Sequence, residues 1–327
     1  MHVFLPNKHT LHHPKQDYSD GIPPFEHLEV PERVDAVLQG IKAVTDLNLI
    51  IVNELAIDAV YNLHDRDYID FLLAISKVLK PEQEYIPSIF RNNLSQSPLL
   101  YRAGMYCREI GTPINKGSAE AALNSAAVAE QAADCLLTTG QDAIALCRPP
   151  GHHAGKKRYG GYCFFNNAYI AAKALKQQCA VLDIDYHFGD GSIEFANAEI
   201  PYFSLHVDPW KNYPYLDTDI VLPTRYTNLI TIPGGIKGES YINLFRKLLT
   251  KLTDFKYIIV SLGFDNLATD HIQDEHVYLE PKDYYIIGQL LARIPAKKLI
   301  VLEGGYDIVN LPACARYFIS GFLHKHI

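Results

Sequence analysis

The sequence predicts an α/β fold in which parallel strands and helices alternate. Short apolar runs that end in polar residues recur through the second half of the chain, a pattern typical of strands buried on both faces. Segments with apolar residues at helical spacing lie between several of these runs. Because strands alternate with helices, we expect a sheet covered by helices.

The predicted elements follow one another from the middle of the chain onward. The strands cover residues 142–147, 179–182, 202–205, 257–262 and 298–302. The helices cover the alanine-rich residues 118–137, residues 166–178 and residues 240–252.

Length and composition favour one large domain. The chain has 327 residues, of which 48% are hydrophobic, enough to bury a sizeable core. No internal repeat or low-complexity linker marks a boundary, so we predict a single domain over residues 1–327. No stretch reaches the roughly 18 apolar residues that cross a bilayer, and the first residues lack a secretory pattern. We therefore expect a cytoplasmic protein without a membrane partner.

Charge and cysteine usage narrow the class of partner. A net charge of -7 without a lysine or arginine run lacks the basic footprint of a nucleic-acid-binding protein, so we expect no nucleic acid partner. Mild acidity suits a cationic substrate, although surface solubility is the better explanation of the same charge. The six cysteines are scattered without paired spacing, and we expect them to be reduced and mostly buried.

One segment, residues 80–112, lacks a helical or strand period. It is rich in proline, asparagine, serine and tyrosine, as a long surface excursion would be. Because loops of this length are more often functional or disordered than idle, we predict a loop-rich insertion at the mouth of a site or at a subunit contact, with an inert loop as the alternative.

Polar side chains stand at the ends of two predicted strands. Asp183, Asp185 and His187 alternate after an apolar run, so the period of an extended chain places them on one face. Asp265 follows a later strand. Asp185, His187 and Asp265 can supply three metal ligands and leave a position for water, as in a catalytic zinc site. The set also suits Fe(II), Co(II) or Mn(II), and any one of these residues alone would be better explained as a helix cap or ion-pair partner.

Two further segments carry groups that suit hydrolysis. His152 and His153 follow a strand in a proline-fixed turn. They could be surface residues or adventitious metal ligands, but beside a metal-activated water they would supply a base and an acid near neutral pH. Asp183 and Asp190 are available to orient them. Tyr306 follows two glycines at a strand end and could donate a hydrogen bond to an oxyanion, although alone it would be a packing residue.

Five segments together resemble the histone deacetylase and acetylpolyamine amidohydrolase family. Each is modestly specific, whereas all five in order are very specific, and the resemblance runs through nearly the whole chain. The segments are residues 148–154, 160–167, 183–191, 261–265 and 303–306. The resemblance implies an arginase-like (deacetylase-like) fold, in which an eight-stranded, mainly parallel sheet lies between helices.

The resemblance also implies metal ions and residue roles. Zn²⁺ would be the catalytic metal, with Fe²⁺ or Co²⁺ as alternatives, and a structural K⁺ is a second candidate ion. By this resemblance Asp185, His187 and Asp265 are the metal ligands. His153 would be the general base, oriented by Asp190, and His152 would stabilise the transition state, oriented by Asp183. Tyr306 would polarise the carbonyl.

Further positions match the substrate channel of the family. Gly161, Tyr162 and Tyr213 stand where the family forms the walls of the acyl-lysine channel. The tyrosines would widen the mouth only if their hydroxyls face water. Ile272 stands where some polyamine-selective relatives carry a glutamate, so that acidic gatekeeper is absent here.

The chain departs from the family pattern at two places. At Phe188 most relatives carry another histidine, which is not a ligand, so we expect activity to be retained. Asp270-His271 replaces the more usual Asp-Pro and leaves the shape of the next loop open.

Within the family the chain is most similar to bacterial acetylpolyamine amidohydrolases. There the insertion helps to build a homodimer and narrows the entrance, so that a slim acetylated polyamine passes more easily than a peptide. We therefore expect a homodimer acting on small acetylated amines, with Glu26, Glu82, Glu84 or Glu109 able to attract an ammonium group. The segments that carry the similarity are residues 20–27, 31–33, 80–112, 111–114 and 213–215.

Three competing interpretations remain at this point. A deacetylase of acetyl-lysine in peptides or proteins would use the same chemistry and differ only in substrate access. A catalytically dead binding module would lack a ligand or Tyr306, and none of these residues is missing. An arginase-like ureohydrolase would require ligands for two metals, and the sequence offers ligands for one.

Overall fold

The computed structural model describes residues 1–19, 21–217, 222–223 and 225–326. At its centre lies an eight-stranded sheet in the order β4-β1-β5-β10-β9-β6-β7-β8, and every neighbouring pair is parallel. Its strands are β1 (His2–Pro6), β4 (Asn48–Val52), β5 (Ala143–Ala145), β6 (Ala180–Asp183), β7 (Tyr202–Val207), β8 (Thr227–Ile232), β9 (Tyr257–Leu262) and β10 (Lys297–Leu302). A two-stranded antiparallel ribbon joins β2 (Gln16–Asp17) to β3 (Phe25–Glu26).

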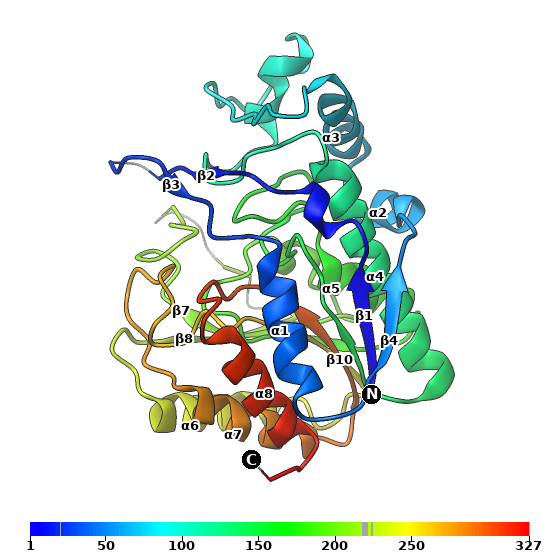
Figure 1. The fold of residues 1–327 in the computed structure, drawn as a ribbon, viewed down its shortest axis with the longest axis vertical. Coiled ribbons are helices and arrows are strands. Elements are labelled where there is room, and N and C mark those ends of the chain that lie inside the picture. The colour runs from blue at the N-terminus through cyan, green and yellow to red at the C-terminus, as the bar shows by residue number, and fades with distance from the viewer. Residues whose placement is uncertain (20, 218–221, 224, 327) are drawn as a thin grey trace.

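Helices cover both faces of the sheet, which confirms the predicted fold class (Figure 1). Alternate residues of β10 belong to the two separate apolar cores, with Leu299 and Val301 in one and Ile300 and Leu302 in the other. On the first face lie α2 (Ile57–Leu63), α3 (Arg66–Val78), α4 (Ser118–Thr139) and α5 (Asn167–Ala174), and on the second lie α1 (Glu32–Lys42), α6 (Gly238–Leu249), α7 (Pro281–Ala292) and α8 (Leu311–Phe322).

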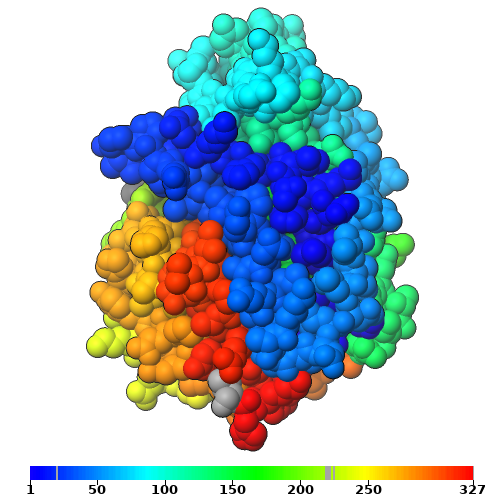
Figure 2. Space-filling view, viewed as in Figure 1, coloured from blue at the N-terminus to red at the C-terminus, as the bar shows by residue number. Residues whose placement is uncertain are grey.

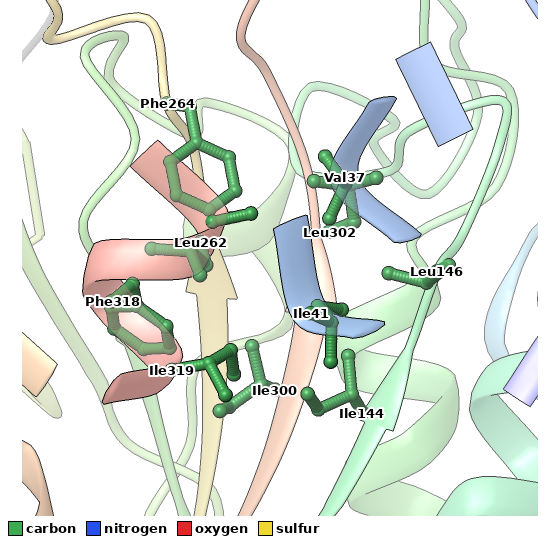
Figure 3. Close-up of a pocket in the computed structure, with 11 residues that line it drawn as sticks. Val37, Ile41, Ile144, Leu146, Leu262, Phe264, Ile300, Leu302, Phe318 and Ile319 are labelled. Carbon is green, nitrogen blue, oxygen red and sulfur yellow. The ribbon is translucent and has the colours of Figure 1, made fainter. Parts of the chain in front are cut away.

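Figure 3 shows how α1 and α8 close the second core over the middle of the sheet. Val37 and Ile41 of α1 and Phe318 of α8 face Leu262 and Ile300 of the neighbouring strands β9 and β10 around a small apolar space. This space lies within the packed core and offers no polar group to a ligand. The apolar packing around this space supports the site indirectly, because it holds in place the strands whose ends carry the polar residues.

All five predicted strands correspond to strands of the sheet, and the three predicted helices correspond to α4, α5 and α6. The sequence interpretation missed β1, β4 and β8. Strands β4 and β8 form the two edges and have partly exposed side chains, and Thr227, Asn228 and Thr231 interrupt the apolar run of β8.

The insertion projects from one end of the molecule, as Figures 1 and 2 show in cyan. Within residues 80–112 the structure has one 3-10 helix, at Leu99–Met105, and is otherwise mostly loop after the end of α3. Tyr85 and Ile114 exchange two backbone hydrogen bonds, of 2.8 and 2.9 Å, and close its base. Asp20, the first residue of the N-terminal segment similar to the polyamine enzymes, lies outside the described residues.

None of the helices in the described part of the chain combines the length and apolar character needed to cross a membrane. Five of the six cysteines are buried and Cys135 is partly exposed, and all six are free, as predicted.

Candidate metal and catalytic centre

The candidate site lies at the carboxyl edge of four adjacent strands, β5, β10, β9 and β6. His152 follows β5, Tyr306 follows β10, Asp265 follows β9, and Asp185 follows β6. Because the strands are parallel, the loops after them converge on one edge of the sheet. Residues far apart in the sequence are thereby brought into one cluster.

Asp185, His187 and Asp265 form the metal-type group at the centre of this cluster. Their ligand atoms all lie within 4.8 Å of one another, and all three side chains are buried. His187 Nδ1 lies 3.0 Å from Asp265 Oδ2 and 3.2 Å from Asp185 Oδ1. The structure thus gathers the three predicted ligands around one point, with Nδ1 as the ring nitrogen that faces the carboxylates.

Backbone groups pack closely against these carboxylates. Gly304 N–H donates to Asp185 Oδ2 at 2.8 Å, and Tyr186 N–H donates to Asp265 Oδ1 at 3.0 Å. A Cβ atom on Gly263 or on Gly304 would overlap the carboxylate oxygens of both aspartates. Glycine is therefore required at these two strand ends so that the chain can approach the site.

The electrostatics of the trio fit a bound dication. Burial and the neighbouring Asp185 raise the pKa of Asp265 above its usual range. Burial lowers the pKa of His187, but hydrogen bonds with Asp185 and Asp265 outweigh it and raise that pKa to about 9. A nearby positive charge stabilises two carboxylates that are buried side by side. Two carboxylate oxygens and one imidazole nitrogen are ligand types that zinc, iron(II) and cobalt(II) bind.

Each of the adjacent histidines is paired with its own aspartate. His153 Nδ1 lies 2.7 Å from Asp190 Oδ1, and His152 Nδ1 lies 3.2 Å from Asp183 Oδ2. The rings of the two histidines lie 4.0 Å apart, and His153 lies 5.7 Å from the ring of His187. Nδ1 of each histidine is therefore engaged by a carboxylate, which orients the ring and leaves Nε2 for chemistry.

The two histidines differ in proton affinity. Burial and the neighbouring His152 lower the pKa of His153 to about 3, although Asp190 opposes them. Burial also lowers the pKa of His152, but the charges of Asp185 and Asp183 outweigh it and raise that pKa well above the ordinary value. Of the two side chains, His153 is thus the one that favours the neutral form and His152 the one that favours the protonated form.

Two arginines reach the aspartate behind His153. Arg158 Nη2 lies 3.0 Å from Asp190 Oδ2, and Arg108 Nη1 lies 3.3 Å from the same oxygen. Burial raises the pKa of Asp190, but the hydrogen bond with His153 and the nearby cations lower it to about 2. Asp190 thus remains ionised, and Arg108, which belongs to the insertion, ties that segment to the catalytic edge.

A second group of potential ligands, His152, Cys163 and Glu303, lies beside the first. Its chemistry does not favour a metal. Glu303 Oε2 already accepts the backbone N–H groups of Gly151 at 2.7 Å and His152 at 3.1 Å, and its Oε1 accepts the hydroxyl of Ser261 at 2.9 Å. Burial raises the pKa of Cys163 well above its usual range, so the thiol stays protonated.

Tyr306 stands beside the trio on a loop that follows a glycine pair. Its phenol is buried, its ring lies 5.5 Å from that of Tyr162, and the guanidinium of Arg33 lies 4.7 Å from the ring centre. Burial raises the pKa of Tyr306 well above 10, so the hydroxyl keeps its proton and can donate it to a hydrogen bond.

Gly161 and Tyr213 lie against His153, and Tyr162 lies beside Tyr306. The Tyr213 ring meets His153 edge-on at 4.8 Å, and a Cβ atom on Gly161 would collide with the His153 ring. The Tyr162 hydroxyl donates to Asp17, and the Tyr213 hydroxyl is buried. Neither hydroxyl faces water, so the tyrosines narrow the site rather than widen its mouth.

Sequence reasoning did not find Asp17 and proposed another role for Glu109. Glu109 Oε1 accepts the Gly161 N–H at 2.9 Å and the Thr112 hydroxyl at 2.7 Å, so its carboxylate is engaged by these neighbouring groups. Asp17 lies in the short ribbon of the N-terminal segment. Neither residue follows a predicted strand, and no local spacing marks either of them.

Two positions singled out in the sequence take less direct parts. The backbone N–H of Ile272 donates a hydrogen bond to Asp270 Oδ1 at 3.2 Å. Phe188 is fully buried and packs 4.7 Å from the ring of His206, away from the ligand atoms.

Geometry of this kind is that of a hydrolase which attacks an amide. The chain belongs to the family described as the histone deacetylase domain, which matches residues 27–322, and it is a hydrolase that deacetylates amides. The acetylpolyamine amidohydrolase of Mycoplana ramosa is 30% identical over 335 residues, covering 95% of this chain and 96% of the relative. Acetylpolyamine amidohydrolase 2 of Pseudomonas aeruginosa is 29% identical over 348 residues and covers 100% of both chains.

The fold comparison agrees with the sequence comparison. A crystal structure of the acetylpolyamine aminohydrolase from Burkholderia pseudomallei superposes with a TM-score of 0.89 at 29% sequence identity, covering 98% of each chain. The predicted family resemblance is therefore confirmed over the whole chain.

Proposed function

We propose that the protein is a zinc-dependent deacetylase that hydrolyses the acetamide of N-acetylated polyamines or related small amines. The observation that carries the proposal is the buried trio of Asp185, His187 and Asp265 beside two aspartate-paired histidines. Iron(II) and cobalt(II) suit the same donor set and are alternatives to zinc. The structural K⁺ and the cytoplasmic location stay predictions.

In the proposed mechanism each group has one task. A metal bound by the trio supplies a Lewis acid for the amide carbonyl and for water. His153 Nε2 takes a proton from the attacking water, and Asp190 stabilises the imidazolium that forms. His152 and the hydroxyl of Tyr306 stabilise the oxygen that gains charge, and the leaving amine receives the proton from His153.

Two buried tyrosines beside the site support a slender acyl-amine as the substrate. Tyr162 and Tyr213 stand close to the catalytic groups, with their hydroxyls turned away from water. The relatives matched over the full chain are named for acetylpolyamines, which supports the same substrate class. Glu26 and Glu82 remain exposed and can attract an ammonium only weakly, because water screens them.

Hydrolysis of acetylputrescine tests the proposed activity. Protein stripped of metal and reloaded with one equivalent of zinc is expected to release acetate and putrescine in equal amounts, whereas the stripped protein releases neither. Acetate release that does not depend on added metal would contradict the metal mechanism.

Subunit assembly is the second part of the proposal. We propose a homodimer formed through the insertion, where Ile89, Leu100 and Tyr101 are 40%, 49% and 51% exposed around a pocket of about 170 Å³. Apolar side chains gathered in this way are typical of a protein contact surface.

Shortening the insertion is expected to give a monomer with altered selectivity. Replacing residues 87–103 by a short Gly-Ser linker leaves the Tyr85–Ile114 pairing and Arg108 in place. Steric exclusion would be relieved, so kcat/KM for an acetyl-lysine peptide should rise about tenfold relative to acetylputrescine. Size-exclusion chromatography and paired kinetics measure the two effects.

A milder variant separates assembly from gating. Leu100→Ser with Tyr101→Ser removes exposed apolar side chains and keeps the length of the segment. This control should be monomeric. A shortened protein that stays dimeric and keeps the substrate ratio of the parent would refute the insertion model and leave the chemistry untouched.

A further inference from the structure

Tyr306 lies on a loop whose backbone does not fix the phenol by itself. Gly304 and Gly305 precede it, and Gly305 has a φ of +112°, a conformation that glycine adopts without strain. Such a loop has many alternative conformations, so the direction of the Tyr306 side chain depends on contacts from other segments. The relevant contacts come from Asp270 and Arg33.

Asp270 holds the peptide groups on both sides of the Tyr306 Cα. Its Oδ2 accepts the N–H of Tyr306 at 2.6 Å and the N–H of Asp307 at 3.2 Å. Its Oδ1 accepts the Ile272 N–H at 3.2 Å, and the side chain is 4% exposed. Because one oxygen fixes both flanking peptides, it also fixes the direction in which the phenol leaves the backbone.

The loop that carries Asp270 is anchored to a metal ligand. Gln273 Nε2 donates to the carbonyl oxygen of Asp265 at 2.6 Å and to that of Leu267 at 3.0 Å. Thr269, the neighbour of Asp270, donates its hydroxyl to Asp307. Residues 265–273 therefore form a brace between the metal trio and the Tyr306 loop.

Arg33 supports the same loop from the other side. Its Nε donates to the Gly305 carbonyl at 2.6 Å and its Nη2 to the Glu303 carbonyl at 2.5 Å, while Glu29 accepts its Nη1 at 2.7 Å. These contacts hold the carbonyl groups that precede Tyr306. Among the hydrogen bonds of the described residues, only Asp270 accepts the N–H groups of Tyr306 and Asp307.

We propose that Asp270 is a positioning residue that fixes the Tyr306 hydroxyl relative to the metal site. The inference rests on the proposed role of Tyr306. This role explains why the loop carries an aspartate, because a charged acceptor forms stronger hydrogen bonds with backbone N–H groups than a neutral one. The position of the loop matters for catalysis, because a displacement of about 1 Å can lower the rate by up to about 10².

Two substitutions probe this brace in different ways. Asp270→Asn keeps the shape but places an NH₂ group against at least one of the three backbone N–H donors. Asp270→Glu keeps the charge and moves the acceptor by one methylene. Each should lower kcat for acetylputrescine about tenfold, with little change in KM and with bound zinc retained.

The decisive comparison repeats both substitutions in a Tyr306→Phe background. There the hydroxyl that Asp270 positions is already absent, so each substitution should change kcat less than about twofold. Asp283→Asn is the matched control, because Asp283 is also a buried aspartate that accepts a backbone N–H, from Glu280 at 2.8 Å, at the start of α7. It should leave kcat unchanged in both backgrounds.

Three results would overturn the proposal. Equal losses of kcat in the two backgrounds, or loss of zinc or of folding by both Asp270 variants, would assign Asp270 a structural role. Unchanged kcat with zinc retained would show that the brace is dispensable. If Tyr306→Phe alone leaves kcat unaltered, the proposed role of Tyr306 fails first, and that outcome is distinct from the others.

Discussion

Asp185→Ala and His187→Ala are each expected to remove bound metal and deacetylation together. Either substitution leaves two protein ligands, and two do not hold an open zinc site. Metal affinity should fall by more than the roughly 10–100-fold that loss of an outer hydrogen-bond partner costs. Metal analysis of the purified variants, alongside acetate release from acetylputrescine, measures both effects.

Asp254→Ala provides the control for these variants, because this exposed aspartate lies away from the strand ends that carry the site. It should keep one equivalent of metal and normal turnover. A ligand variant that keeps a full equivalent of metal and normal turnover would show that the ligands are assigned wrongly.

Tyr306→Phe is expected to lower the chemical step by on the order of 10² to 10³, or about 2.7–4 kcal/mol. The phenyl ring can keep the contacts of Tyr306 with Tyr162 and Arg33, so the fold and the metal content should not change. Substrate affinity should change little, because the hydrogen bond serves the oxyanion rather than the ground-state amide. Single-turnover kinetics isolate the chemical step.

The exposed Tyr278 provides a matched substitution, and Tyr278→Phe should leave the single-turnover rate as it is. Near-normal turnover by Tyr306→Phe would place its hydroxyl away from the scissile carbonyl.

The central strands and the clustering of Asp185, His187 and Asp265 were predictable from the sequence for a physical reason. Strands buried on both faces must be apolar throughout, so a polar residue such as Asp185 at the end of such a run stands out. Parallel pairing then brings the ends of β6 and β9 together, which joins Asp185 and His187 to Asp265 without any further information.

The supports of the site were not predictable in the same way. Asp17 lies in the short two-stranded ribbon, and Glu109 and Asp270 lie on loops. They reach the site through hydrogen bonds to residues as distant in sequence as Tyr162. Which backbone N–H a loop carboxylate meets depends on the path of the loop, and neither period nor spacing encodes that path. For the same reason Glu109 was interpreted as a site for an ammonium, whereas its partners are Gly161 and Thr112.

The substrate claim is tested most directly by comparing kcat/KM of the zinc-loaded protein for acetylputrescine, acetylspermidine and an acetyl-lysine peptide. The proposed deacetylase of small amines should turn over both polyamines with at least about tenfold higher kcat/KM than the peptide, a preference of about 1.4 kcal/mol. A higher kcat/KM for the acetyl-lysine peptide than for either polyamine would contradict the account and identify a peptide deacetylase.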